Sequence, residues 1–247
     1  NQAFKQVRLE TGPLSPALPA GFSAETGSLT WFGRIQTPIE NLKLTLLPQT
    51  LFKSEKNLGF RAGQGQGTLQ GTMTGFNAGT NRFSTLDLDF ANLAVNGFEW
   101  KSPRYNLVLS LLAGGTLAVS KTQKTLRGTA VFTDFKIRLP GPGNKQGPAP
   151  SIAFSRMDLE YKTEKDRLML TKCTAAGKDF NLELSGSISL SGRGALALKG
   201  SIKPSPQFFK TFDKHPAMKR LFQKAKAAGH IPVSLSGTVQ NPLLRFR

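Results

Sequence analysis

The sequence has very few of the residues that build reactive sites. Its 247 residues include one cysteine, Cys173, and two histidines, His215 and His230. A single thiol forms no internal disulfide and no zinc knuckle, which fits a reducing compartment or a periplasmic protein without disulfides. No stretch approaches the roughly 18 apolar residues of a membrane-spanning helix, so no such helix is expected in this chain.

Acidic residues are also scarce. The sequence has 15 Asp and Glu against 33 Lys and Arg, a formal net charge of +18. Such a charge suits nucleic acid or an anionic membrane surface. The basic residues are dispersed, however, and no finger, helix-turn-helix or RNA-binding motif is present. We therefore expect no specific nucleic-acid binding and keep an anionic membrane surface as a partner.

Catalytic motifs are missing from the sequence. There is no G-x-S-x-G nucleophile elbow, and His and Cys do not cluster as zinc ligands do. The glycines of Gly63–Gly67 lead into a strand pattern without the helix of a dinucleotide site, so they favour a tight connection or close strand packing. Asp87 and Asp89 point to one outward face of a strand, as solvated residues do. We expect no enzyme, no cofactor and no metal.

Period-two alternation of apolar and polar residues dominates what is present. Successive side chains of a strand point to opposite faces, so each alternating run predicts a half-buried strand. Runs of this kind occur around Leu42–Leu46, Leu69–Gly75, Leu86–Phe90, Tyr105–Leu111, Val131–Leu139, Met157–Tyr161, Leu168–Leu170, Leu182–Leu190, Leu196–Ile202 and Ile231–Val239.

Turn residues separate these runs and set the predicted fold class. Asn77-Ala-Gly79, Asn96-Gly97, Gly114-Gly115 and Ser191-Gly-Arg-Gly194 are the main turn signals, and Asn96-Gly97 is typical of a two-residue hairpin. Turns at this spacing without intervening helices favour an antiparallel meander. We predict a mainly β fold, a long curved antiparallel meander sheet that is sandwich-like or trough-like.

The sequence reads as a single β-rich domain, 1–247. Residues 1–28 are weakly patterned and read as a lead from an anchor, since the chain begins at Asn1 and not at Met. The Pro- and Gly-rich segment 140–150 predicts a mobile loop. Residues 205–229 predict a helical insert, in which Ser205 and Pro206 open a short helix that breaks near Pro216.

Glycines recur at inward positions of the predicted strands. They allow sharp coiling or a close approach of the backbone to a packing neighbour, or else they mark bulges without a functional role, and the sequence does not decide between these readings. The positions are Gly71, Gly75, Gly186, Gly200 and Gly237.

The helical insert is the predicted contact site. Its basic amphipathic pattern is typical of a helix lying on a membrane or a partner. The alternative is a helix packed on the sheet with solvated lysines. The candidate contact residues are Lys219, Arg220, Lys224, Lys226, Phe208 and Phe212.

The C-terminal half carries a recurrent signature. One strand pattern ends in Gly200-Ser-Ile-Lys-Pro204, and the insert is followed by Gly229-His-Ile-Pro-Val-Ser-Leu-Ser-Gly-Thr-Val-Gln-Asn-Pro242. These segments resemble type II secretion system protein N, GspN, in which G-x-I-x-P precedes an insert and then G-x-I-P-x-x-[IL]-x-G-T-x-x-x-P. The resemblance extends over residues 29–247 and is strongest at 181–242, and Gly63 to Gly71 is similar to the family's central glycine-rich strand. Similar strands occur in AsmA-like and TamB-like envelope proteins.

The resemblance implies a periplasmic domain of an accessory subunit, anchored to the bacterial inner membrane by an N-terminal helix outside this sequence. Two functions stay open. One is an interaction protein that binds other inner-membrane and periplasmic subunits of type II secretion. The other is a lipid-handling module whose sheet presents an apolar groove to phospholipid acyl chains. A filled interior indicates the first, and an open trough lined by Leu and Phe indicates the second.

Overall fold

The computed structural model describes residues 7–13, 15–17, 20–31, 35–50, 52, 54–77, 83–101, 106–138, 151–191, 194–206, 229–239 and 241–246. Nearly all of these residues lie in β-strands, with a short 3-10 helix, η2, at Pro48–Thr50. The predicted mainly β class is confirmed. The strands are β1 (Val7–Thr11), β2 (Ser15–Ala17), β3 (Gly21–Trp31), β4 (Ile35–Leu46), β5 (Lys56–Gln64), β6 (Gly67–Phe76), β7 (Thr85–Lys101), β8 (Asn106–Ser120), β9 (Thr125–Arg138), β10 (Ser151–Glu164), β11 (Arg167–Gly177), β12 (Phe180–Ser189), β13 (Leu196–Pro204), β14 (Ile231–Thr238) and β15 (Asn241–Phe246).

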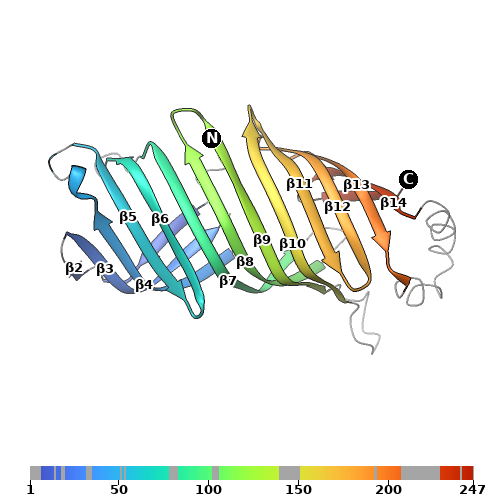
Figure 1. The fold of residues 1–247 in the computed structure, drawn as a ribbon, viewed down its shortest axis with the longest axis horizontal. Coiled ribbons are helices and arrows are strands. Elements are labelled where there is room, and N and C mark those ends of the chain that lie inside the picture. Colours follow the sequence, from blue (N-terminus) through green and yellow to red (C-terminus); the bar gives the residue numbers. More distant parts are fainter. Residues whose placement is uncertain are drawn as a thin grey trace. The chain divides into compact units, whose positions relative to one another are not determined.

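Strands that follow one another in the chain pair with one another in the sheet. The hydrogen-bonded order runs from β1 through β3 and β4 to β15 in sequence order, and β2 pairs with β3 beside this path. The pairing is antiparallel, as between β10 and β11 or β12 and β13. Antiparallel neighbours need only short connections. The predicted antiparallel meander is therefore confirmed, and Figure 1 shows β10 to β13 side by side.

The chain divides into two compact units. Unit 1 comprises Asn1–Val95 and Ala113–Ala130, and unit 2 comprises Asn96–Leu112 and Val131–Arg247. Each unit buries apolar side chains of its own, such as Ile39 and Leu42 in unit 1 and Phe135 and Phe154 in unit 2.

Alternation explains the burial of individual strands. In β13, Leu196 and Leu198 are buried while Ala197 and Lys199 between them are exposed. A strand that is dry on one face and wet on the other needs this two-residue period. The prediction of a strand at Leu196–Ile202 is confirmed.

The Gly63–Gly67 segment forms a tight hairpin. Gln64 pairs with Gly67, so Gly65 and Gln66 form the two-residue loop between β5 and β6. Gly65 has a φ of +53°, a left-handed conformation that glycine adopts at low cost. The interpretation of this segment as a tight connection is confirmed.

Two predicted turns are wrong. Asn96-Gly97 lies inside β7, and Gly114-Gly115 lies inside β8. Turn propensity is local, and here the pairing of long neighbouring strands overrides it. Gly115 instead serves a close approach, because a Cβ added there would overlap the carbonyl oxygen of Thr129 in the neighbouring strand β9.

Several strands lie where the sequence predicted none. Residues 7–28, read as a weakly patterned lead, contain β1, β2 and most of β3, and β5 and β15 were also missed. β3 pairs with β4 along its length, from Gly21↔Thr45 to Trp31↔Ile35. Sheet pairing therefore stabilises these segments in place of a strong apolar rhythm of their own.

Two predicted segments fall outside the described residues. These are the loop at 140–150 and the helical insert from residue 207 to residue 228.

The strand register shows what the inward glycines do at two positions, Gly200 and Gly71. A Cβ at Gly200 would overlap the carbonyl oxygen of Glu183, and a Cβ at Gly71 would overlap that of Asp87. The pairing of β13 with β12 and β14, and of β6 with β7, runs through these glycines without a shift. These glycines therefore allow a close approach of neighbouring backbones, and they are not bulges.

Candidate functional site

The predicted contact residues are not among the described residues. Lys219, Arg220, Lys224, Lys226, Phe208 and Phe212 all lie within 207–228. The predicted contact site therefore stays a prediction. The feature that stands out in the described chain is instead the contrast between the two faces of the sheet.

In unit 2, side chains on one face align in rows across the strands. The middle row is continuous from β10 to β15, and every member is apolar, a glycine or the thiol. It consists of Leu159, Cys173, Leu184, Gly200, Val233 and Phe246. A row on each side has the same character, with Met157, Ala175, Leu182, Ile202 and Ile231 on one side and Tyr161, Leu170, Gly186, Leu198, Leu235 and Leu244 on the other. We call these three rows the unit-2 apolar face.

Unit 1 repeats this arrangement. Its middle row is Phe22, Leu44, Phe60, Gly71 and Leu88. The flanking rows are Leu46, Leu58, Met73 and Leu86, and Ala62, Leu69 and Phe90. We call this set the unit-1 apolar face. Neither apolar face contains a charged residue.

Many side chains of the two apolar faces are only partly buried. Val233 is 3% exposed and Leu198 is 6% exposed, whereas Leu182, Leu184 and Ile202 are only half-buried. Other members of the rows are more exposed: Phe22 and Leu244 are each 47% exposed, and Phe246 is 39% exposed. Large apolar side chains that are aligned in a row and partly exposed to solvent form a surface suited to apolar contact.

The two weakly acidic groups on the unit-2 apolar face are both neutral near pH 7. Desolvation by burial raises the pKa of the Cys173 thiol to about 11. Burial also raises the pKa of the Tyr161 phenol above its ordinary value. The thiolate is the nucleophilic form of cysteine, so Cys173 behaves as a small apolar residue and the face carries no charge.

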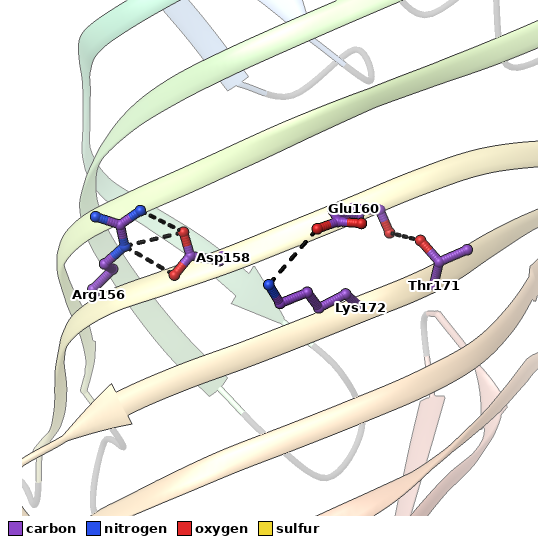
Figure 2. A network of polar contacts seen from close by, with 5 residues as sticks. All are labelled: Arg156, Asp158, Glu160, Thr171 and Lys172. Carbon is purple, nitrogen blue, oxygen red and sulfur yellow. Dashed lines mark hydrogen bonds and ion pairs between the residues drawn. The ribbon is translucent and has the colours of Figure 1, made fainter.

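The opposite face of unit 2 carries paired charges (Figure 2). The Arg156 guanidinium donates to both carboxylate oxygens of Asp158, with Nη2 at 2.7 Å from Oδ1 and Nε at 2.9 Å from Oδ2. The hydrogen bond from Arg156 lowers the pKa of Asp158, and the positive charges of Arg156 and Lys172 add to this effect. Across the strands, Lys172 Nζ lies 3.7 Å from Glu160 Oε1. The charges of this face are therefore largely compensated by one another.

The same polar face extends over β12 and β13. Lys203 Nζ lies 3.5 Å from Glu183 Oε1, and both side chains are more than half exposed. In unit 1 the polar face carries Lys43, Arg61 and Asp89 around an open depression beside Gly59. Polar side chains also line a depression in unit 2. The linings also include residues of the middle apolar rows, Phe60 and Gly71 in unit 1 and Cys173, Leu184 and Gly200 in unit 2.

The described residues contain little that resembles an active site. No group of three or more His, Cys, Asp and Glu is placed to hold a metal ion in the part of the chain that the structure describes. Asp87 and Asp89 are exposed on the polar face of β7, as predicted, and His230 is exposed. His215 lies outside the described residues.

Among the described residues, no helix has the length and apolar character needed to cross a membrane.

Sequence reasoning identified most of the strands that build the apolar faces and named an apolar groove of the sheet as one of two possibilities, but it placed the candidate contact residues on the helical insert. The signal was present in the alternating runs, because Leu182, Leu184 and Leu198 had been read as one-sided strands. Predicting the site required the register, which aligns these runs into rows. β15, which extends the rows with Leu244 and Phe246, was not predicted at all.

Comparisons of the chain with protein-family models, with curated proteins and with solved structures gave no match.

Proposed function

We propose that this chain is a non-enzymatic module that holds phospholipid acyl chains along its apolar faces. The observation that carries the proposal is the row of Leu159, Cys173, Leu184, Gly200, Val233 and Phe246, which crosses β10 to β15 without a charged side chain. Acyl chains are long, flexible and wholly apolar. A long one-sided apolar surface removes them from water without requiring a closed cavity.

The charge of the chain suits an anionic headgroup. The net charge is +18, and each Lys or Arg near an anionic lipid surface contributes up to about 1 kcal/mol. Four of the described carboxylates of unit 2 form ion pairs with basic neighbours: Asp158 with Arg156, Glu160 with Lys172, Glu164 with Lys162 and Glu183 with Lys203. The remaining positive charge attracts a phosphate-bearing lipid and not a cationic one.

The cellular setting that we propose follows from the resemblance to GspN. The chain would be the periplasmic domain of an inner-membrane accessory subunit of the type II protein secretion system, in contact with other subunits of that system. The support for this setting is the resemblance itself, carried by Gly200 to Pro204, which lie in β13, and by Ile231 to Thr238, which form β14. Acyl-chain binding is then the biochemical activity of the domain within that assembly.

Native mass spectrometry of gently purified protein tests the proposal. We expect phospholipid to remain bound and to be enriched in anionic species relative to the membrane of the expression host. Leu184→Gln, on the apolar face, should reduce the retained lipid, and Ser185→Gln, its neighbour on the polar face, should not. Circular dichroism of both variants controls for folding.

Two results would contradict the proposal. One is wild-type protein that carries no lipid and takes up none from anionic vesicles at low salt. The other is equal lipid retention by folded Leu184→Gln and folded Ser185→Gln, since binding would then not involve the apolar face.

A further inference from the structure

β15 ends the order of paired strands within the described chain. Its residues Asn241–Phe246 pair with β14 from Thr238↔Asn241 to Val233↔Phe246, and no other described strand pairs with it. A strand with one paired side presents N–H and C=O groups on the other side, where a further strand can bind.

The hydrogen bonds of β15 show which residues face this edge. The backbone N–H of Asn241 donates to Thr238 Oγ1 at 3.1 Å, and the Ser236 hydroxyl donates to the Leu243 carbonyl oxygen at 3.5 Å. Both contacts are directed at β14. Backbone groups alternate in direction along a strand, so Pro242, Leu244 and Phe246 direct theirs away from β14.

Pro242 supports this assignment independently. Proline has no N–H to donate, and within sheets it is confined to positions whose N–H side faces away from the ladder. Leu244 and Phe246 follow at two-residue intervals and do carry an N–H. The open edge therefore offers two consecutive donor–acceptor positions after Pro242.

The side chains of β15 determine what kind of strand fits there. Leu244 and Phe246 continue rows of the unit-2 apolar face and are 47% and 39% exposed. Natural edges are often protected by an inward-pointing charge, but these positions carry none. Arg245, between them, is exposed on the polar face opposite Ser234, and no ion pair to it occurs among the described residues.

We propose that the open edge of β15 binds an extended segment of a partner protein by adding it as a further strand. The segment has apolar side chains at alternate positions, which cover Leu244 and Phe246, and acidic side chains between them, which face Arg245. The net charge of +18 disfavours a second copy of this chain and favours an acidic partner. The proposal does not depend on lipid binding.

A labelled peptide of about eight residues, within the usual strand length of about 3–10 residues, tests this interaction by fluorescence anisotropy. The probe alternates Val with Glu, and measurement at about 0.15 M salt limits non-specific attraction to the basic chain. The matched variants are Leu244→Pro, which removes an outward N–H, and Leu244→Ala, which keeps the N–H and loses the side chain. We expect Leu244→Pro to weaken binding at least about tenfold and Leu244→Ala to weaken it less, with melting temperatures close to that of wild type.

Arg245→Glu adds a test of charge. This variant should lose affinity for the Val-Glu probe and gain it for a Val-Lys probe of the same length. The proposal is overturned if Leu244→Pro binds the probe as tightly as Leu244→Ala does. It is also overturned if a probe N-methylated at alternate backbone nitrogens binds as well as the unmodified one, because binding would not then use a strand edge.

Sedimentation of the wild-type chain tests the choice of occupant. A dimer that Leu244→Pro abolishes would show that the edge binds a second copy, and would overturn the assignment to an acidic partner. A monomer that binds the probe supports it. Lipid retention measured on the Arg245→Glu protein, whose changed side chain lies on the polar face opposite Ser234, separates failure of this proposal from failure of lipid binding.

Discussion

The two faces of unit 2 belong to the same strands but differ in their side-chain contacts. Several charged side chains on one face have partners within the chain, whereas several apolar side chains on the other face remain partly exposed to water. On the polar face, Arg156 pairs with Asp158, and Lys203 pairs with Glu183. On the apolar face, Leu182, Leu184 and Ile202 are half-buried, and exposure reaches 47% at Leu244. The polar face is well solvated by water, whereas burial of the exposed apolar side chains on the other face would be favourable. This difference places the proposed activity on the apolar face.

The largest expected effect comes from a charge on the apolar face. Leu198→Asp places a carboxylate at a position that is 6% exposed, without a basic partner in its row, and should destabilise the fold by about 3–5 kcal/mol. Ala197→Asp, one residue away on the polar face, should change stability by no more than about 0.5 kcal/mol. Urea denaturation measures both, and equal midpoints would refute the assignment of the faces.

A smaller loss is expected where backbones approach closely. Gly200→Ala forces a methyl group against the carbonyl oxygen of Glu183 and should cost about 2–3 kcal/mol. Gly59→Ala is the matched control, because its nearest added contact is 3.9 Å away, to Leu47 Cδ2, and its effect should stay within about 1 kcal/mol. Thermal unfolding distinguishes the two. A Gly200→Ala protein as stable as Gly59→Ala would mean that the strands are not so close.

A third change removes a side chain that acts as a strand partner. The Gln64 amide accepts from the Ala94 N–H at 2.7 Å and donates to the Ala94 carbonyl oxygen at 3.1 Å. Gln64→Leu leaves both backbone groups without this partner and should cost about 1–2 kcal/mol. Gln70→Leu, on the exposed polar face of β6, should cost less than about 0.5 kcal/mol. The prediction fails if chemical denaturation ranks the two variants in the opposite order.

The smallest effect is expected for an ion pair of the polar face. Glu183→Gln removes the 3.5 Å contact with Lys203, and the two side chains are 57% and 58% exposed. Exposed pairs contribute roughly 0–1 kcal/mol, so the free energy of unfolding should change by less than about 0.5 kcal/mol. A double-mutant cycle with Lys203→Gln measures the coupling, and a coupling above about 1 kcal/mol would show that this face does more than keep the sheet soluble.

Much of the fold could be predicted because apolar and polar residues alternate regularly in the strands with buried side chains. In β13 the alternation of Leu196, Ala197, Leu198 and Lys199 is regular, and the strand was found. β15 escaped detection because Leu243 and Leu244 are adjacent, which breaks the two-residue period.

The wrongly predicted turns, and the alignment of residues on the apolar faces, depend on interactions between strands and not on the pattern within one strand. Asn96-Gly97 is a strong local turn signal, yet it lies within β7, because pairing over the length of the strand outweighs local preference. The apolar faces depend on which residues stand opposite one another, as Leu184 and Gly200 do. Strand register is a non-local property, so a pattern within one strand does not reveal it.

The central claim, that acyl chains lie on the apolar face and not on the polar face, is tested most directly by brominated phospholipid. Trp31 and Trp100 are replaced by Phe, and a single tryptophan is introduced at Leu184 or at Ser185, neighbours on opposite faces of β12. Phospholipid brominated on its acyl chains should quench the fluorescence of Leu184→Trp strongly and leave that of Ser185→Trp nearly unchanged. Equal quenching at the two positions, or stronger quenching at Ser185→Trp, would contradict the account.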